Sequence, residues 1–364
     1  MSRSNVPDAA SSFSSTSASP TSAGQTPVSR TLVDGHGRTV RYLRLSMTDR
    51  CNLRCIYCRS NARERCIPHN EVLRYEEMLR VVDAAVGAGV EKVRLTGGEP
   101  FARKDVMRFL EMLRGRFPRV DVRITTNGTL MRQHVAALRE LGVTAINLSL
   151  DSFRPEGFAA VTGRDLLPEV RASMDAIMEV GIRLKINAVG LRGINDGEMA
   201  AFLDFARRNP VDVRFIEFMP MGSGTRWSEQ NFWAAKDILA AAREVADLTP
   251  LHLTGAQGGA YNGPARMFGI AGGEGRFGLI TPMSNHFCAS CNRLRVTSDG
   301  FLRTCLFADK EYRLRGILRH PRLGLETLQK VMALANQDKP LGEELLHARR
   351  ETAVARKRMV SIGG

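Results

Sequence analysis

Apolar positions along the chain follow two alternating periods after about residue 40. Apolar and polar side chains alternate in six short segments that we predict to be strands: 41–47, 91–96, 121–126, 145–151, 183–189 and 211–217. Between them apolar residues recur at helical spacing, at 75–88, 104–114, 133–141, 168–180 and 196–208. This alternation predicts an α/β fold whose parallel sheet has its helices outside, either doubly wound or curled into a barrel.

One face of most of these strands is polar near its carboxyl end. Residues two apart share a face, and the resulting polar sets are Arg44 with Ser46, Lys92 with Arg94 and Thr96, Thr125 with Asn127, Asn147 with Ser149 and Asp151, and Lys185 with Asn187. Any single set could lie on a solvent-facing edge strand. Together they favour an incomplete (β/α)6 barrel of the TIM type with a cavity for a large polar ligand, since ordinary barrel interiors are filled by branched apolar side chains.

The chain divides into three regions by composition. Residues 1–30 are rich in Ser, Thr, Ala and Pro, and we expect a disordered leader there. Residues 31–225 hold the predicted barrel, and 226–364 lose the strand–helix rhythm, so we expect a second, smaller unit. No run approaches the roughly 20 apolar residues of a membrane span, and we expect no membrane association.

Charge and cysteine content narrow the functional classes. A formal net charge of +14 suits a polyanionic partner, either nucleic acid or a nucleotide triphosphate. The seven cysteines are clustered and no secretory signal precedes them. Such a set more often binds metal in the cytoplasm than forms disulfides, and we expect a cytoplasmic protein.

Three cysteines directly after the first predicted strand have the spacing CxxxCxxC: Cys51, Cys55 and Cys58. They offer an iron–sulfur cluster three thiolates and leave one iron without a protein ligand. A zinc site needs four ligands and prefers CxxC pairs, so zinc ranks well behind. After the second strand, Gly97 and Gly98 permit a close backbone approach to an ammonium group, and Glu99 could add charge there.

A second triad follows in the C-terminal region, where Cys288 and Cys291 form a CxxC and Cys305 follows a hairpin around Asp299-Gly300. It again offers three thiolates. The alternative is a structural zinc site with His286 as the fourth ligand. Arg293-Leu294-Arg295 lies between the cysteines, and two guanidinium groups beside a cluster suit phosphate or nucleobase recognition.

The CxxxCxxC with Tyr57 before its last cysteine resembles the signature of the radical S-adenosylmethionine (SAM) superfamily. Within it, nearly the whole chain after residue 30 resembles the GTP 3′,8-cyclase family, which opens molybdenum cofactor biosynthesis. The matching runs are RLSMTDRCNLRCIYC, RLTGGEP, TTNG, SLD, KIN, RFIEFM, FCASCNRLR, SDG and the terminal Gly-Gly. Cys66 and the Ser-rich leader have no place in this pattern.

The resemblance implies two [4Fe-4S] clusters, one on Cys51, Cys55 and Cys58 and one on Cys288, Cys291 and Cys305. For SAM it implies Tyr57, Gly98, Ser149 and Met219. For GTP it implies Arg44, Arg94, Thr125, Lys185 and Arg293-Leu294-Arg295, with Lys92 and Arg214 as further candidates. The terminal Gly363 and Gly364 are implied to enter the barrel, although a frayed end is the usual state of a terminus.

The implied reaction is that of a lyase in which a SAM-derived radical removes the ribose 3′ hydrogen of GTP. The carbon radical then closes onto carbon eight of guanine, with no residue as a conventional acid or base. The implied partners are a one-electron donor and a downstream cyclic pyranopterin synthase, and a homodimer is compatible with the sequence. Two alternatives stay open: a radical SAM enzyme acting on a peptide, and a zinc-stabilised nucleic-acid binding protein, against which the CxxxCxxC spacing argues.

Overall fold

The computed structural model describes residues 31–58, 66–222, 225–251, 263–348, 355–357 and 359–363. The leader expected at 1–30 lies outside this part of the chain, as does Gly364. Within the described residues, none of the helices combines the length and the apolar character that crossing a bilayer requires.

Six consecutive parallel strands form the centre of the fold. They are β1 (Tyr42–Ser46), β2 (Lys92–Thr96), β3 (Asp121–Thr126), β4 (Ala145–Ser149), β5 (Arg183–Gly190) and β6 (Asp212–Glu217). Each pairs in parallel with the next, so the strand order follows the chain order. All six predicted strands are confirmed, with ends that differ by two residues or fewer.

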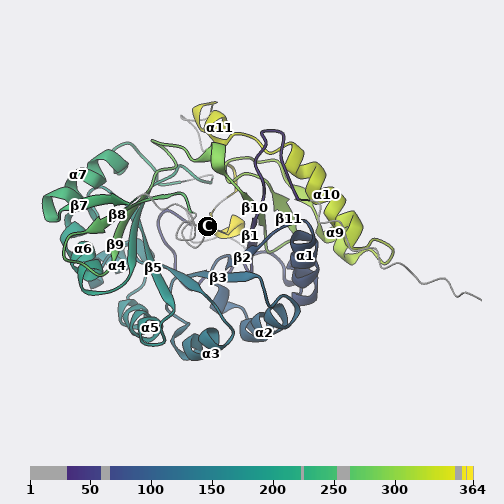
Figure 1. Cartoon of the computed structure of the whole chain (residues 1–364), viewed down its shortest axis with the longest axis horizontal. Coiled ribbons are helices and arrows are strands. Elements are labelled where there is room, and N and C mark those ends of the chain that lie inside the picture. Colours follow the sequence, from purple (N-terminus) through teal and green to yellow (C-terminus); the bar gives the residue numbers. More distant parts are fainter. Residues whose placement is uncertain are drawn as a thin grey trace, which may run out of the picture.

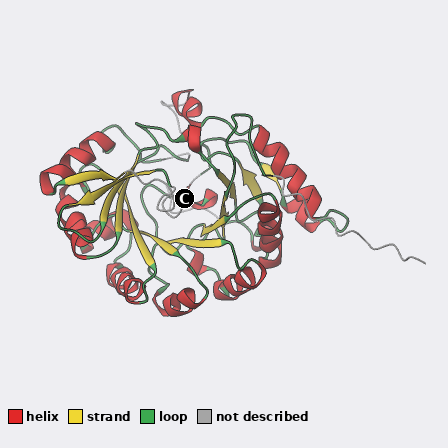
Figure 2. Cartoon of the chain, viewed as in Figure 1, coloured by secondary structure: helices red, strands yellow, loops and turns green. Residues whose placement is uncertain are grey.

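Helices cover the outside of the curled sheet (Figures 1 and 2). The helices that connect the strands are α1 (Tyr75–Gly87), α2 (Val106–Arg116), α3 (Val135–Glu140), α4 (Pro155–Thr162), α5 (Leu167–Glu179) and α6 (Met199–Arg208). Five of them match predicted helices, whereas the eight-residue α4 was not expected because it is too short for a clear period. The expected start of α2 was two residues early, since Asp105 has left-handed backbone (φ 58°) just before the helix.

Strands from beyond residue 225 extend this sheet at both edges. β10 (Arg293–Val296) pairs in parallel with β1, and β9 (Arg276–Ile280) pairs in parallel with β6. The antiparallel strands β11 (Phe301–Arg303), β12 (Tyr312–Arg313), β8 (Ala265–Ile270) and β7 (Leu248–Leu251) complete it. The result is a 12-stranded sheet with β12 and β7 as its edges, so the barrel is incomplete.

The remaining helices are α7 (Ala235–Val245), α9 (Arg315–Arg319), α10 (Leu325–Gln337), α11 (Gly342–Ala348) and α12 (Met359–Ile362). Single-turn 3₁₀ helices are η1 (His69–Glu71), η2 (Pro100–Ala102), η3 (Arg132–His134), η4 (Asp196–Glu198) and η5 (Cys288–Ser290). α12 lies inside the ring of strands, close to the C-terminus marked in Figure 1.

The main core lies between the sheet and its outer helices. The apolar face of each strand points toward the outer helices, and Leu43 and Leu45 on that face of β1 are fully buried. Aromatic rings link β6 to its neighbours, because Phe215 packs edge-on against Phe202 of α6 at 5.0 Å and against Trp233 at 5.7 Å. With the apolar faces turned outward to the helices, the polar faces are left to line the barrel interior.

Candidate active site

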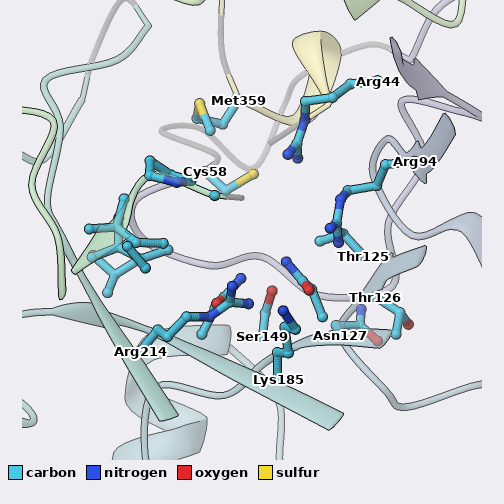
Figure 3. Close-up of a pocket in the computed structure, with 18 of the residues that line it drawn as sticks. Arg44, Cys58, Arg94, Thr125, Thr126, Asn127, Ser149, Lys185, Arg214 and Met359 are labelled. Carbon is cyan, nitrogen blue, oxygen red and sulfur yellow. The ribbon is translucent and has the colours of Figure 1, made fainter. Parts of the chain in front are cut away.

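A cavity inside the barrel is lined by polar faces of the parallel strands (Figure 3). The structure brings most of the predicted site residues together in its wall: Arg44, Cys51, Cys55, Tyr57, Cys58, Lys92, Arg94, Gly98, Thr125, Ser149, Lys185, Arg214, Met219 and Arg293. Most side chains labelled in Figure 3 come from strands on both sides of the ring, and Cys58 of the loop after β1 and Met359 of α12 lie around the same space.

The first cysteine triad faces this cavity from the loop that follows β1. Its three cysteines form no disulfide and are only partly exposed, and the amide of Asn127 lies 3.6 Å from Cys51 Sγ. Burial raises the pKa of the Cys55 thiol, and Asp151, Cys58 and Cys51 raise it further, which reflects how closely the three thiols are grouped. Three clustered thiols beside an open cavity fit an iron–sulfur cluster with one iron left for a small ligand.

The cysteine loop is anchored to the rest of the barrel by hydrogen bonds. Tyr57 donates its hydroxyl hydrogen to Asp151 Oδ2 at 2.7 Å, and the same carboxylate accepts from the backbone of Val189 at 2.8 Å. The backbone of Arg54 and of Ile56 donates to carbonyls at the end of α4. The unexpected helix α4 therefore has a role in holding the cluster loop.

Gly97 and Gly98 pack against the segment that leads to Cys51. A Cβ on Gly98 would lie 2.1 Å from the carbonyl oxygen of Arg50, and one on Gly97 would lie 2.4 Å from that of Thr48. Gly97 also has φ +136°, a conformation that side chains disfavour. The glycines are thus needed for contact with the cysteine loop, and Gly98 also lines the cavity.

Glu99 is turned away from the position the sequence suggested, where its charge would lie beside a SAM ammonium. It is fully buried and absent from the cavity wall. Its carboxylate accepts from Thr126 Oγ1 at 2.8 Å and from the backbone of Asn127 at 2.7 Å. Burial raises the pKa of Glu99 to about 7, although these donors lower it. Its contacts fix the loop after β3, which carries the amide that reaches Cys51.

Four arginines occupy one row across neighbouring strands. Arg44 of β1 is in register with Arg295 on one side and Arg94 on the other, and Arg94 is in register with Arg123. Burial lowers the pKa of Arg44 to about 10, although Tyr42 raises it, and Arg94 lowers it further. Arg123 pairs with Asp121 at 2.8 Å. Four like charges on adjacent strands are nevertheless destabilising without further anions between them, so this row suits a polyanion.

The opposite wall adds a second cationic group, on β5 and β6. Lys185 lies 3.6 Å from Asp212. Burial lowers the pKa of Lys185 to about 6, and the charge of Arg214 lowers it as well, whereas the charge of Asp212 raises it. Arg214 Nε and Nη2 are buried without a hydrogen-bond partner among the described residues, as is Asn187 Oδ1. Buried polar atoms without partners are costly, and a polar ligand in the cavity would satisfy them.

The second triad lies beside the cavity, on η5 and just after β11. A Cβ on Gly342 would be 3.2 Å from both Cys288 Sγ and Cys305 Sγ, which places these two thiols around one backbone position. Burial raises the pKa of the Cys291 thiol, but Lys339 and Arg293 lower it overall. The three thiols fit a second cluster.

The alternative zinc site would use His286 as its fourth ligand. The ring of His286 lies 6.1 Å from that of His347. In the part of the chain that the structure describes, no three His, Cys, Asp or Glu side chains are placed to hold a single metal ion. Cysteines that bind a cluster each ligate a different iron, so they need not converge on one point.

Two buried cations that sequence reasoning missed hold the second triad in place. Arg38 donates to the carbonyl of Cys288 at 2.8 Å and pairs with Asp34 at 2.6 Å. Lys339, 1% exposed, donates to the carbonyls of Cys291 and Arg293 at 2.8 and 2.9 Å. The backbone of the cysteine loop is therefore fixed from outside the cavity.

The C-terminal segment enters the barrel as the family resemblance implied. The carbonyl of Gly363 accepts a hydrogen bond from Arg295 Nη1 at 2.8 Å, and Met359 lines the cavity. Arg295 is covered by this segment and does not line the cavity. Gly364 lies outside the described residues.

Leu294 differs from its two neighbours. Its side chain is fully buried in the main core on the opposite face of β10, so only its backbone is available to a ligand in the barrel. Conversely, Tyr42, Arg123 and Asp212 line the cavity and were not predicted. Tyr42 and Arg123 each stand two residues before a predicted site residue, and that period of two was the signal that could have found them.

Known proteins cover this chain almost from end to end. Residues 45–206 match the family model of the radical SAM superfamily, and residues 211–345 match that of Molybdenum Cofactor Synthesis C. The GTP 3′,8-cyclase of Syntrophomonas wolfei is 39% identical over 92% of this chain and 100% of its own length. That of Listeria monocytogenes serovar 1/2a is 37% identical over 92% and 99%.

Among solved structures, Streptococcus suis SuiB bound to S-adenosylmethionine is similar with a TM-score of 0.59. The match covers 90% of this chain and 78% of that chain at 15% identity, which supports the fold alone. The radical SAM fold agrees with the incomplete barrel, its cysteine loop after β1 and its polar cavity. Since the curated relatives match over their whole length, the chain belongs to the GTP 3′,8-cyclase family of radical SAM enzymes.

Proposed function

We propose that this protein is a lyase that converts GTP to (8S)-3′,8-cyclo-7,8-dihydroguanosine 5′-triphosphate, the first step of molybdenum cofactor biosynthesis. Arg44, Arg94 and Arg123 of the arginine row, on β1, β2 and β3, carry the proposal, because they line the same cavity as the cysteines of the first triad. Forked guanidinium donors match phosphate oxygens. Family membership supplies the chemistry of SAM and one [4Fe-4S] cluster.

Cys51, Cys55 and Cys58 would hold the SAM cluster, with Tyr57, Gly98, Ser149 and Met219 around SAM. Arg44, Arg94, Thr125, Lys185 and Arg293 would bind GTP, with Lys92 and Arg214 beside them, whereas Arg295 would hold the C-terminal segment through its hydrogen bond to Gly363. When bound, the cluster and SAM supply the radical that takes the ribose 3′ hydrogen. The protein's own task is to hold the two ligands in line and to exclude water, and a conventional acid or base has no part in it.

Cys288, Cys291 and Cys305 would hold a second [4Fe-4S] cluster, whose open iron would contact guanine. Arg38 and Lys339 support this assignment, since they fix the backbone of the triad while its cysteines form no disulfide. A one-electron donor would reduce the SAM cluster, and a cyclic pyranopterin synthase would consume the product. The same proposal places the enzyme in the cytoplasm, where such clusters and GTP are available, and leaves a homodimer open.

The titration of Lys185 predicts how GTP binding depends on pH. Its pKa of about 6 leaves the free side chain mostly neutral at pH 8. A triphosphate favours the charged form and raises that pKa, so binding takes up a proton and affinity grows as pH falls from 8 toward 6. We expect up to about tenfold per pH unit, measured by calorimetry with GTP.

The matched control is Lys185→Arg, which keeps the charge but does not titrate in this range. Titration of the nucleotide itself affects both proteins equally, so the difference between them isolates Lys185. An equal pH dependence in the variant and the unmodified protein would count against the assignment of Lys185 to GTP.

The function is tested by anaerobic reconstitution with iron and sulfide, followed by addition of SAM, dithionite and GTP. We expect about eight irons per chain, 5′-deoxyadenosine and a cyclised guanine nucleotide. About four irons with bound zinc would make the second triad a zinc site. Formation of 5′-deoxyadenosine without GTP consumption would move the substrate elsewhere, for example to a peptide.

A further inference from the structure

A second cavity, of about 1100 Å³, lies outside the barrel between α1, η2 and α9. It is lined by segments that follow β1 and β2 at their carboxyl ends, by the start of α1, and by residues 318–323. α1 and α9 lie side by side at one side of the ring in Figure 1. None of the residues assigned above to SAM, GTP or a cluster lines it.

This outer cavity is strongly basic. Its lining includes six arginine and lysine side chains, Arg50, Arg74, Arg80, Arg103, Lys104 and Arg319, and Asp105 as the one carboxylate among the lining residues. The buried Glu77 behind them pairs with Arg319 at 2.8 Å and with Arg74 at 3.4 Å. Glu76 and Glu71 also act on Arg103 and Arg319, so the six positive groups outnumber four carboxylates and a net positive charge remains for an anionic partner.

The deeper cations Arg103 and Arg80 are held by backbone carbonyl oxygens, while Glu76 and Glu77 act on the charge of Arg103 at longer range. Arg103 donates to the carbonyls of Met47 and Leu73 at 2.5 and 2.6 Å, and Arg80 donates to that of Leu323 at 3.2 Å. At the rim, Arg50 and Lys104 are exposed and form no ion pair with a described residue. The basic surface is thus built into the fold and open to solvent.

The outer cavity shares a wall with the active site. Thr48 and Arg50 line the outer cavity, and Cys51, the next residue, lines the inner one. The wall is tied to the glycine segment, because Gly98 donates to the carbonyl of Thr48 at 2.6 Å. A molecule seated outside would be separated from a cluster on Cys51 by little more than one strand of backbone.

We infer that this outer cavity is the docking site of an acidic protein that delivers one electron to the SAM cluster. The inference rests on the proposed function, which requires a reduced cluster for each SAM cleaved. The donor loses one electron and the cluster on Cys51, Cys55 and Cys58 gains it, with no atom transferred. An acidic protein surface complements the basic rim, and its position shortens the electron's path to the cluster.

The test uses a flavodoxin, a small acidic flavoprotein, and the reconstituted enzyme. We expect the double variant Arg74→Glu/Lys104→Glu to weaken flavodoxin binding at least about tenfold at low salt. The matched control is Lys236→Glu/Arg243→Glu on α7, which makes the same change of charge with exposed residues on the opposite side of the ring in Figure 1. That control should bind as the unmodified enzyme does, by interferometry with oxidised flavodoxin.

Rates separate docking from catalysis. The rim variant should accept electrons from reduced flavodoxin about tenfold more slowly, yet form 5′-deoxyadenosine with dithionite at the unmodified rate. Equal weakening in both double variants, unchanged binding in the rim variant, or equal loss with dithionite would overturn the inference. So would equally charge-sensitive binding of duplex DNA or inorganic phosphate at the rim, or failure to bind either flavodoxin or an acidic ferredoxin. Failure of the proposed function would be seen separately, as unmodified enzyme that consumes no GTP with dithionite.

Discussion

Replacing Cys58 with serine is expected to lower 5′-deoxyadenosine formation by at least about 10³-fold, because groups that act as a unit fail together when one is removed. Cys58 faces the cavity in the same group as Cys51 and Cys55. Serine would leave the cluster with two thiolates and expose its iron to water. The measurement is quantification of 5′-deoxyadenosine after anaerobic incubation with SAM and dithionite.

Cys66→Ser is the matched control, since it makes the same chemical change at an exposed cysteine that belongs to neither triad. We expect it to keep full activity and a full iron content. The Cys58 variant should retain only the iron of the second triad, about half the total. Retention of SAM cleavage by the Cys58 variant, or an equal loss in the Cys66 variant, would contradict the cluster assignment.

The parallel strands of the barrel could be predicted because their pattern is local. Each strand has one face against the helices and one toward the cavity, so a period of two is visible within five to eight residues. The same pattern predicted that Arg44, Arg94 and Lys185 point inward, and they do line the cavity. The same period of two extends back from Arg44 to Tyr42, the first residue of β1, and could have predicted that Tyr42 also points inward. The ring of Tyr42 contacts Arg94.

What the sequence could not show depends on pairing between distant segments. Residues 276–280 and 293–296 extend the sheet beside β6 and β1, at sequence separations that no local pattern reports. Arg38 reaches a carbonyl 250 residues away. Such contacts follow from the tertiary register of the sheet, and a lone arginine near the start of the domain has no distinguishing signal.

The case of Glu99 shows a different limit. Its motif correctly indicated a close backbone approach, but the partner is the segment before Cys51. The carboxylate is used to hold Thr126 and Asn127. The glycine motif therefore predicted the position of a close backbone contact, whereas only the structure shows which segment and which side chains form the contacts.

Deleting Gly363 and Gly364 is expected to lower GTP consumption by about 10²-fold or more, equivalent to about 2.7 kcal/mol, without unfolding the enzyme. Gly363 places its carbonyl 2.8 Å from Arg295 Nη1, in the same short segment as Met359, which lines the cavity. Its φ is +77°, and a Cβ there would lie 2.3 Å from Thr96 Oγ1. The free volume of the cavity is about 290 Å³ with α12 in place, so small displacements of this segment change the space for ligands.

Stability should change little, because the deletion removes two hydrogen bonds of Gly363, each worth about 1 kcal/mol, while the buried Val360 and Ile362 remain. Gly363→Ala should act in the same direction as the deletion through its strained backbone. Gly316→Ala is the matched control, since nothing lies within 4 Å of its added Cβ and its φ is not positive. GTP consumption and melting temperature are measured together on all three proteins. Full activity of the truncated protein would show that the terminal glycines are a frayed end, and a collapse of its melting temperature would assign them to folding.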